Sequence, residues 1–290
     1  MSIPFDTDCI LCHLKRNIAT ARELGTEEQA IEFTKDLMRL YQGVSAEKSF
    51  TILNAAVSDL LKERYGVDED RFKKEKEDSN RFVLSRLDQI RTRVEKAKDS
   101  VYAGLQFAIL GNYIDFGALQ GELSFDQLDE LLERGEQMDL DREVYAKLCA
   151  DLQKGGKLLY LTDNAGEIGF DRVLAEELQK KYPGIQITFC VRGAPALNDA
   201  TREDAAIMGI PFPVIDNGTR IAGTEIDMLG QEAKAALETA DVVIAKGMGN
   251  TETMFGCGYN VYYAFLVKCS RFEKVFGKPK FTPMLVSERK

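Results

Sequence analysis

The chain has 290 residues and 44% of them are hydrophobic, which is enough for one large domain or two ordinary domains with buried cores. Its 38 basic and 47 acidic residues give a net charge of −9, which argues against a nucleic-acid partner. Residues 1–8 lack the apolar segment of a signal peptide and the longest apolar run, residues 261–267, is too short to cross a bilayer, so we expect a cytoplasmic protein without a membrane partner.

The first half of the chain predicts helices only. Apolar residues recur at helical spacing, as at Ile52, Ala55, Ala56 and Leu60, and glycines or short polar stretches separate most of the segments. Ser124 is a candidate helix cap, with a glutamine three positions later. We expect a helical N-terminal domain at residues 1–153, with helices at residues 9–24, 27–42, 46–65, 71–97, 101–110, 124–132 and 142–152.

The second half predicts alternating strands and helices. Short connections between them are typical of a mostly parallel, Rossmann-like sheet covered on both faces, so we expect an α/β/α sandwich at residues 154–290. No glycine-rich dinucleotide fingerprint follows the first strand, and no P-loop motif occurs. The expected strands are residues 157–161, 186–191, 212–215, 242–245 and 261–267, and the expected helices are residues 170–182, 201–208 and 229–239.

Three of these strands end in polar loops that contain glycine. Ligands bind at the carboxyl ends of the strands in open α/β sheets, so the three loops are expected to share one rim. Carboxylate and amide oxygens suit a hard cation such as Mg²⁺, and a helix start suits phosphate. Taken singly, each loop could be ordinary cap or turn chemistry. The polar residues in question are Asp163, Asn164, Arg192, Asn198, Asp199, Lys246 and Asn250.

Several motifs carry a resemblance to a known family over nearly the whole chain. They are Cys9-x-x-Cys12, Asp70 to Lys76 followed by Asn80, Gly111-Asn112-x-x-Asp115, Asp163-Asn164-Ala165-Gly166-Glu167 with Phe170-Asp171, Asn198-Asp199-Ala200-Thr201, Lys246-Gly247-x-Gly249-Asn250 and Lys268-Cys269. The sequence resembles the damage-control phosphatases, formerly domain of unknown function 89, in their prokaryotic Cys-x-x-Cys branch. Arg71 and Phe72 replace the proline and tyrosine of the family pattern, and the short basic tail after Cys269 is a further departure that could alter the sheet edge.

The resemblance implies a helical part on an α/β/α sandwich, and metal-dependent hydrolysis of small phosphorylated metabolites such as sugar phosphates or damaged phosphometabolites. A divalent ion (Mg, Mn, Co or Ni) would be held by Asp163, Asn164 and Asp199, and would polarise the phosphoryl oxygens. Lys246 would contact the phosphate and act in catalysis together with Asp163 and Asn164. The resemblance assigns substrate contacts to Asn112, Asp115, Gly166, Glu167, Asn198, Gly247 and Asn250.

Other interpretations stay open at this point. An S-adenosylmethionine-dependent carboxyl methyltransferase ranks below the phosphatase because the glycine-rich first loop is missing. A non-enzymatic metal- or phosphometabolite-binding protein is a third hypothesis. Cys9 and Cys12 share a helix face and, with Cys269 or His13, could form a second, soft-metal site. The sequence leaves open the metal, the physiological substrate, the oligomeric state and whether Asp163 also attacks phosphorus.

Overall fold

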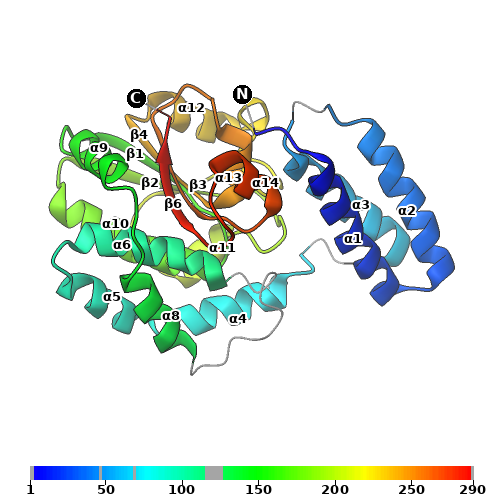
Figure 1. Ribbon diagram of the computed structural model, residues 1–290, viewed down its shortest axis with the longest axis horizontal. Helices are drawn as coiled ribbons and strands as arrows, with labels where there is room; N and C mark the ends of the chain where they lie inside the picture. Colours follow the sequence, from blue (N-terminus) through cyan, green and yellow to red (C-terminus); the bar gives the residue numbers. More distant parts are fainter. Residues whose placement is uncertain (1–2, 46–47, 68–69, 115–126, 289–290) are drawn as a thin grey trace.

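The computed structural model describes residues 3–45, 48–67, 70–114 and 127–288 (Figure 1). The predicted α/β class and the mostly parallel sheet are confirmed. Six strands form one sheet in the order β3-β2-β1-β4-β5-β6, in which only β6 is antiparallel to its neighbour. The strands are β1 Gly156–Leu161, β2 Ile185–Val191, β3 Val214–Asp216, β4 Val242–Lys246, β5 Val261–Leu266 and β6 Pro283–Ser287.

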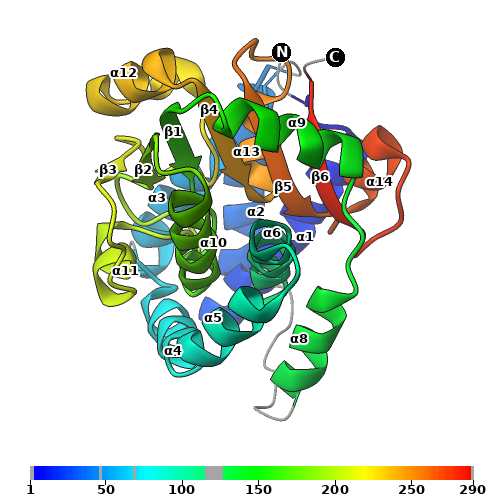
Figure 2. The same ribbon diagram turned by 90° about the vertical axis from the view of Figure 1, so that its left-hand side faces the viewer.

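Helices cover both faces of the sheet because alternate strand residues point to opposite sides, and on both sides those residues are apolar. Tyr160 and Ile244 face one hydrophobic cluster, whereas their neighbours Leu159 and Val243 face the other. Figure 2 shows α10 and α6 packed side by side on the first face. The first face carries α4 Lys73–Leu84, α5 Leu87–Lys96, α6 Ser100–Leu110, α8 Gln127–Glu136, α9 Arg142–Leu152, α10 Glu167–Lys181 and α11 Arg202–Ile207; the second carries α12 Gln231–Thr239, α13 Gly247–Met254 and α14 Ser270–Phe276.

Helix α6 is buried along its whole length, from Val101 to Leu110, as expected for a helix that is apolar on every side. It lies between α10 and strands β5 and β6. The core of the first face therefore includes residues on both sides of position 153. The division of the chain into domains at 153/154 stays a prediction, and the hydrophobic core crosses it.

The first helices form a separate layer, seen at the right of Figure 1. This cap consists of α1 Thr7–Leu24, α2 Glu27–Gln42, the 3₁₀ turn Phe50–Ile52 and α3 Leu53–Tyr65. It has its own small core, built around Ala21, Phe33 and Leu61. Charged contacts link the cap to the sheet, including Lys48 Nζ–Glu225 Oε1 at 2.8 Å and Lys274 Nζ–Asp8 Oδ2 at 2.6 Å.

Some element boundaries differ from the sequence expectation. The helix expected at residues 71–97 is interrupted at residues 85–86, where Ser85 Oγ donates to Phe82 O at 2.7 Å and competes with the helix ladder. The helix expected from residue 46 begins at Leu53, after the turn capped by Ser49. The candidate cap Ser124 lies outside the described residues. Helices α13 and α14 and strand β6 were not predicted, and the basic tail supplies the edge strand.

Within the described ranges, no helix combines the length and the apolar character needed to span a bilayer.

Candidate active site

The polar loops after β1, β2 and β4 meet at the carboxyl end of the sheet. The order of the strands reverses between β1 and β4, and such a switch point is the usual ligand site of a doubly wound sheet. The backbone N–H of Ala165 donates to Asn198 O at 2.9 Å, and that of Ala200 donates to Asp163 O at 2.7 Å. These two bonds bring Asp163, Asn164 and Asp199 into one cluster.

Two glycines allow this close packing. Gly166 has φ +74°, and a Cβ at this position would collide with Ser79. Gly247 has φ +78°, and a Cβ there would lie within contact distance of the whole Asp163 carboxylate. Because only glycine adopts such a backbone at no steric cost, the fold requires glycine at both positions.

Asp163 is the centre of a buried acidic cluster. Asn112 Nδ2 and Asn164 Nδ2 donate to Asp163 Oδ2 at 2.8 and 2.9 Å, and the same two nitrogens donate to Glu167 Oε2 at 2.8 and 2.9 Å. Burial, and then the negative charges of Glu167 and Asp199, raise the pKa of Asp163 well above its ordinary value. A bound cation would relieve this repulsion.

The available donors fit a hard divalent ion. Asp163, Asn164, Asp199 and Asn112 line one cavity, and the buried Oδ1 of Asn112 has no hydrogen-bond partner. In the described residues no three His, Cys, Asp or Glu side chains are placed to hold a metal by themselves. An ion here would therefore depend on amide oxygens as well as on Asp163 and Asp199. Such an all-oxygen set is typical of Mg²⁺ or Mn²⁺.

Arg192 supports Asp199 and was not assigned a role from the sequence. Its Nε donates to Asp199 Oδ2 at 2.5 Å, and its Nη1 donates to Asn250 Oδ1 at 3.2 Å. Both members of the Arg192–Asp199 pair are buried. Asn250 also donates to Thr162 O and Lys246 O, and thereby links the loops after β1 and β4. It does not line the cavity.

Lys246 is placed differently from the phosphate contact that the resemblance implies. It is fully buried, and its Nζ donates to Glu167 Oε1 at 2.6 Å, Ala108 O at 2.7 Å and Asp171 Oδ1 at 2.9 Å. An ammonium has three donors, and all three are used. Burial alone would lower the pKa of Lys246, but Asp171 and Glu167 raise it above its ordinary value. As the structure stands, Lys246 organises Glu167 and does not line the cavity.

A cavity of about 420 Å³ lies between the cap and the sheet. Asn198 lines it along with the metal-ligand candidates, as does Lys268, to which the resemblance assigned no role. The positive charges of Arg192 and then Lys268 offset part of the rise in the pKa of Asp163, so Lys268 lies near the acidic cluster. Gly166 and Glu167 lie behind the cavity wall, and Asp115 lies outside the described residues.

The cysteines of the expected second site line this same cavity. Cys9, Cys12 and Cys269 all face it, together with His13, but they do not form a metal-binding cluster among the described residues. Burial raises the pKa of Cys9 to about 11. The thiol is therefore protonated at neutral pH, and a protonated thiol is a weak metal ligand. The second, soft-metal site stays a prediction.

His13 is not placed for acid–base work at neutral pH. Its ring contacts Tyr41 through Nδ1 at 2.7 Å. Burial, and then the positive charge of Arg16, lower the pKa of His13 to about 4, so the ring is neutral. Since His13 is the only histidine, a phosphohistidine mechanism has no other candidate.

Comparisons with known proteins agree with this architecture. Residues 5–282 match the family described as the damage-control phosphatase ARMT1-like domain. The chain is 34% identical to an uncharacterised protein of Methanocaldococcus jannaschii, over 95% of this chain and 93% of that protein. It is 31% identical to a damage-control phosphatase of Archaeoglobus fulgidus, over 93% of this chain and 94% of that protein. The crystal structure of a Pyrococcus horikoshii protein of the same family, formerly domain of unknown function 89, covers 99% of both chains with a TM-score of 0.80 and 25% identity. The chain belongs to the damage-control phosphatase ARMT1-like family.

Proposed function

We propose that the protein is a metal-dependent phosphatase that hydrolyses phosphate monoesters of small metabolites. The observation that carries this proposal is the buried cluster of Asp163, Asp199, Asn112 and Asn164 at the switch point of the sheet, open to a cavity of about 420 Å³. A cavity of that size suits a small metabolite. The relative from Archaeoglobus fulgidus, which carries the name damage-control phosphatase, supports the same activity.

In this proposal Asp163, Asn164 and Asp199 hold the divalent ion. When bound, the ion would polarise the phosphoryl oxygens and lower the pKa of a water molecule. Lys268 offers positive charge from the cavity wall to the phosphate oxygens. Asn112 contacts the substrate at the junction of the helical part and the sheet.

Residues behind the metal-ligand candidates hold these candidates in place. Lys246 donates to Glu167 Oε1, and Glu167 Oε2 accepts from the amides of Asn112 and Asn164. The amides are thereby held in one orientation beside Asp163. Arg192 holds Asp199 in the same way. Catalytic geometry of this kind tolerates little displacement, so these supporting residues are expected to matter nearly as much as the ligands.

The decisive experiment is a phosphatase screen of metal-stripped protein, with Mg²⁺, Mn²⁺, Co²⁺ and Ni²⁺ added back separately. Asp163→Asn should lose metal-dependent turnover and bind the activating metal at least about tenfold more weakly, because a charged ligand is replaced. Asp151→Asn is the matched control, since Asp151 is also hydrogen-bonded and partly buried but lies beside Asn260 and Tyr262, away from the cavity. Phosphate release that persists in a chelator, or no release with any metal, would overturn the proposal.

A further inference from the structure

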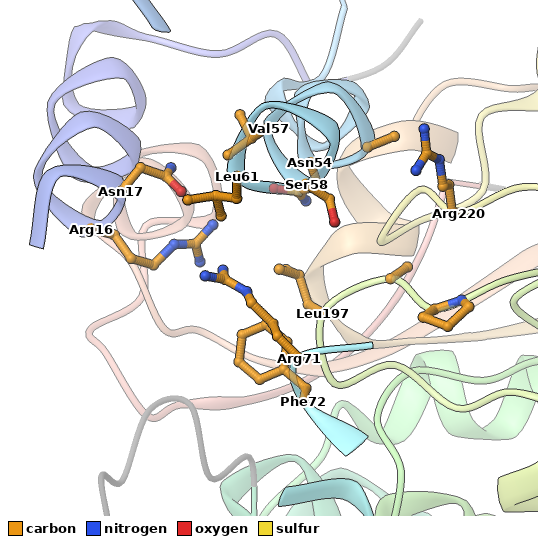
Figure 3. A pocket seen from close by; sticks show the side chains of 13 residues that line it. Arg16, Asn17, Asn54, Val57, Ser58, Leu61, Arg71, Phe72, Leu197 and Arg220 are labelled. Carbon is orange, nitrogen blue, oxygen red and sulfur yellow. The ribbon is translucent and has the colours of Figure 1, made fainter. Parts of the chain in front are cut away.

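A second, small pocket adjoins the cavity (Figure 3). Arg16, Asn54 and Leu197 line both, so the pocket is an extension of the candidate active site under the cap. Its walls come from α1, α3, the segment just before α4 and the loop after β2. A ligand that binds at Asp163 and Asp199 therefore has somewhere to extend.

Two arginines face each other across this pocket. The guanidinium groups of Arg16, on α1, and Arg71, just before α4, point toward one another in Figure 3. Among the described residues neither guanidinium forms an ion pair with a carboxylate, and the Arg71 guanidinium lies over the ring of Phe72, 4.7 Å from its centroid. Arg220 lines the same pocket but is paired with Asp59.

This pair of charges is costly in the free protein. Arg71 is half-buried, and burial together with the positive charge of Arg16 lowers its pKa, although Glu75 and Glu23 act in the opposite direction. The carboxylates of Glu75 and Glu23 offset part of this positive charge, but neither forms an ion pair with Arg71. Two adjacent guanidinium groups without an ion-paired carboxylate match the donor pattern of a site for carboxylate or phosphate.

The segment that carries Arg71 is tied to the candidate active site. Asn80 Nδ2 donates to Asp204 Oδ1 at 2.7 Å, and Asn80 Oδ1 accepts from the backbone N–H of Gly166 at 2.7 Å. Lys76 Nζ lies 3.2 Å from Asp204 Oδ2. The distance from Arg71 to the Asp163 loop is thus set by buried polar contacts.

We propose that Arg16 and Arg71 form a second anion subsite, and that the preferred substrate is a small phosphate monoester with another anionic group at its far end. That group is a carboxylate or a second phosphate. The proposal rests on the proposed function for the placement of the scissile phosphate at Asp163 and Asp199. The subsite would select against phosphomonoesters whose far end is neutral, because these leave the two arginines unpaired.

The test is a calorimetric binding experiment with non-hydrolysable phosphonates in Mg²⁺ buffer. Butylphosphonate has one anionic end, 4-phosphonobutanoate has a carboxylate at the other end, and butane-1,4-diphosphonate has a second phosphonate there. Analogues with two-carbon and six-carbon chains vary the distance between the two ends, so that one of them matches the distance between the metal site and the arginines. Wild-type protein should bind the best two-ended probe at least about tenfold more tightly than its one-ended counterpart, as charge-assisted hydrogen bonds predict. The carboxylate and diphosphonate series distinguish the two kinds of far-end group.

Variants locate the effect. Arg71→Gln and Arg16→Gln should bring the ratio of the two affinities close to one, whereas Arg71→Lys should keep part of it. Arg220→Gln is the matched control and should keep the wild-type ratio, because its charge is already paired with Asp59. Circular dichroism checks that each variant is folded.

Equal wild-type affinities for one- and two-ended probes at every chain length would overturn the subsite, as would an undiminished ratio in folded Arg71→Gln and Arg16→Gln. The binding test of the subsite and the metal screen of the proposed function can succeed or fail independently. A preference for two-ended probes without phosphate release in the metal screen would retain the subsite and reject the phosphatase. Phosphate release without such a preference would do the reverse.

Discussion

Replacing Gly247 with alanine should damage the site through a single methyl group. With Cβ built on Gly247, the nearest carboxyl atom of Asp163, Oδ2, lies at 2.0 Å and the most distant, Oδ1, at 2.6 Å, whereas ordinary contact begins near 3.4 Å. Oδ2 must therefore retreat by about 1.4 Å, the difference between 3.4 and 2.0 Å, or the backbone must move. A displacement of about 1 Å in a catalytic site typically costs about 10²-fold in rate.

The chain offers a matched control for the backbone effect. Gly258 has φ +83°, close to the +78° of Gly247, but a Cβ at Gly258 meets nothing within 4 Å. Gly258→Ala should lower the free energy of unfolding by about 1–2 kcal/mol, which is the usual penalty for an alanine with positive φ. Gly247→Ala should lower it further, because the same strain is added to the collision with Asp163.

Three measurements test this reasoning. Urea unfolding followed by circular dichroism gives the stability of both variants, calorimetry with Mn²⁺ gives metal affinity, and kcat/KM is measured with any substrate found in the metal screen. Gly247→Ala should bind Mn²⁺ at least about tenfold more weakly and lose about 10²-fold in kcat/KM, while Gly258→Ala should match wild type in both. If the two variants were equal in stability and in metal affinity, Asp163 would not be the ligand that Gly247 leaves room for.

Further predictions concern single side chains. Lys246→Met should lower the free energy of unfolding by about 3–5 kcal/mol in a urea titration, because it leaves two buried carboxylates without their cation; an effect on kcat alone would favour a direct phosphate contact. Asp199→Ala should lose metal affinity and also about 3–5 kcal/mol of stability, since Arg192 stays buried without its partner, whereas Asp199→Asn should lose less stability. The ring-proton NMR signals of His13 should not titrate between pH 8 and 5. The free energy of unfolding should fall from about pH 6.5 toward pH 4, because the unfolded histidine binds a proton that the folded one binds only near pH 4. A titration midpoint near 6.5 in the folded protein would contradict this. Cys9→Ser should keep most of the metal-dependent activity, because its thiol is protonated, and a loss equal to that of Asp163→Asn would join the cysteines to the metal site.

The parallel strands were predictable because both of their faces are buried. A strand such as β4 is a nearly continuous apolar run in the sequence, and the polar residues that follow it mark the carboxyl end of the strand. Helix α13 was not predictable in the same way. Gly247 and Gly249 suggest a loop. In the fold, however, Asp163 and the carbonyl of Ala222 crowd these two positions, so glycine is required there by contacts with residues distant in the sequence. Strand β6 likewise depends on pairing with β5, which local propensity does not specify.

The site was predictable as a set of loops but not as a set of contacts. Lys246 ends a strand and precedes glycine, which is the pattern of a phosphate-binding lysine. Only the packing of α10 shows that Glu167 and Asp171, four residues apart on one helix face, both reach it. The Arg16–Arg71 pair joins segments that are 55 positions apart in the sequence, and no local pattern links them.

The cap formed by α1 to α3 should behave as a cooperative unit of its own. Its apolar core is small and separate, and charged contacts supply much of its attachment to the sheet. Contacts of this kind are screened by salt, whereas the sheet core is not. Amide protons of α1 to α3 should therefore exchange with solvent by partial unfolding at a lower free energy than those of β1 and β4, and more readily at high ionic strength. Since the cap forms one wall of the cavity, this partial opening would give bound molecules an exit while the sheet stays folded.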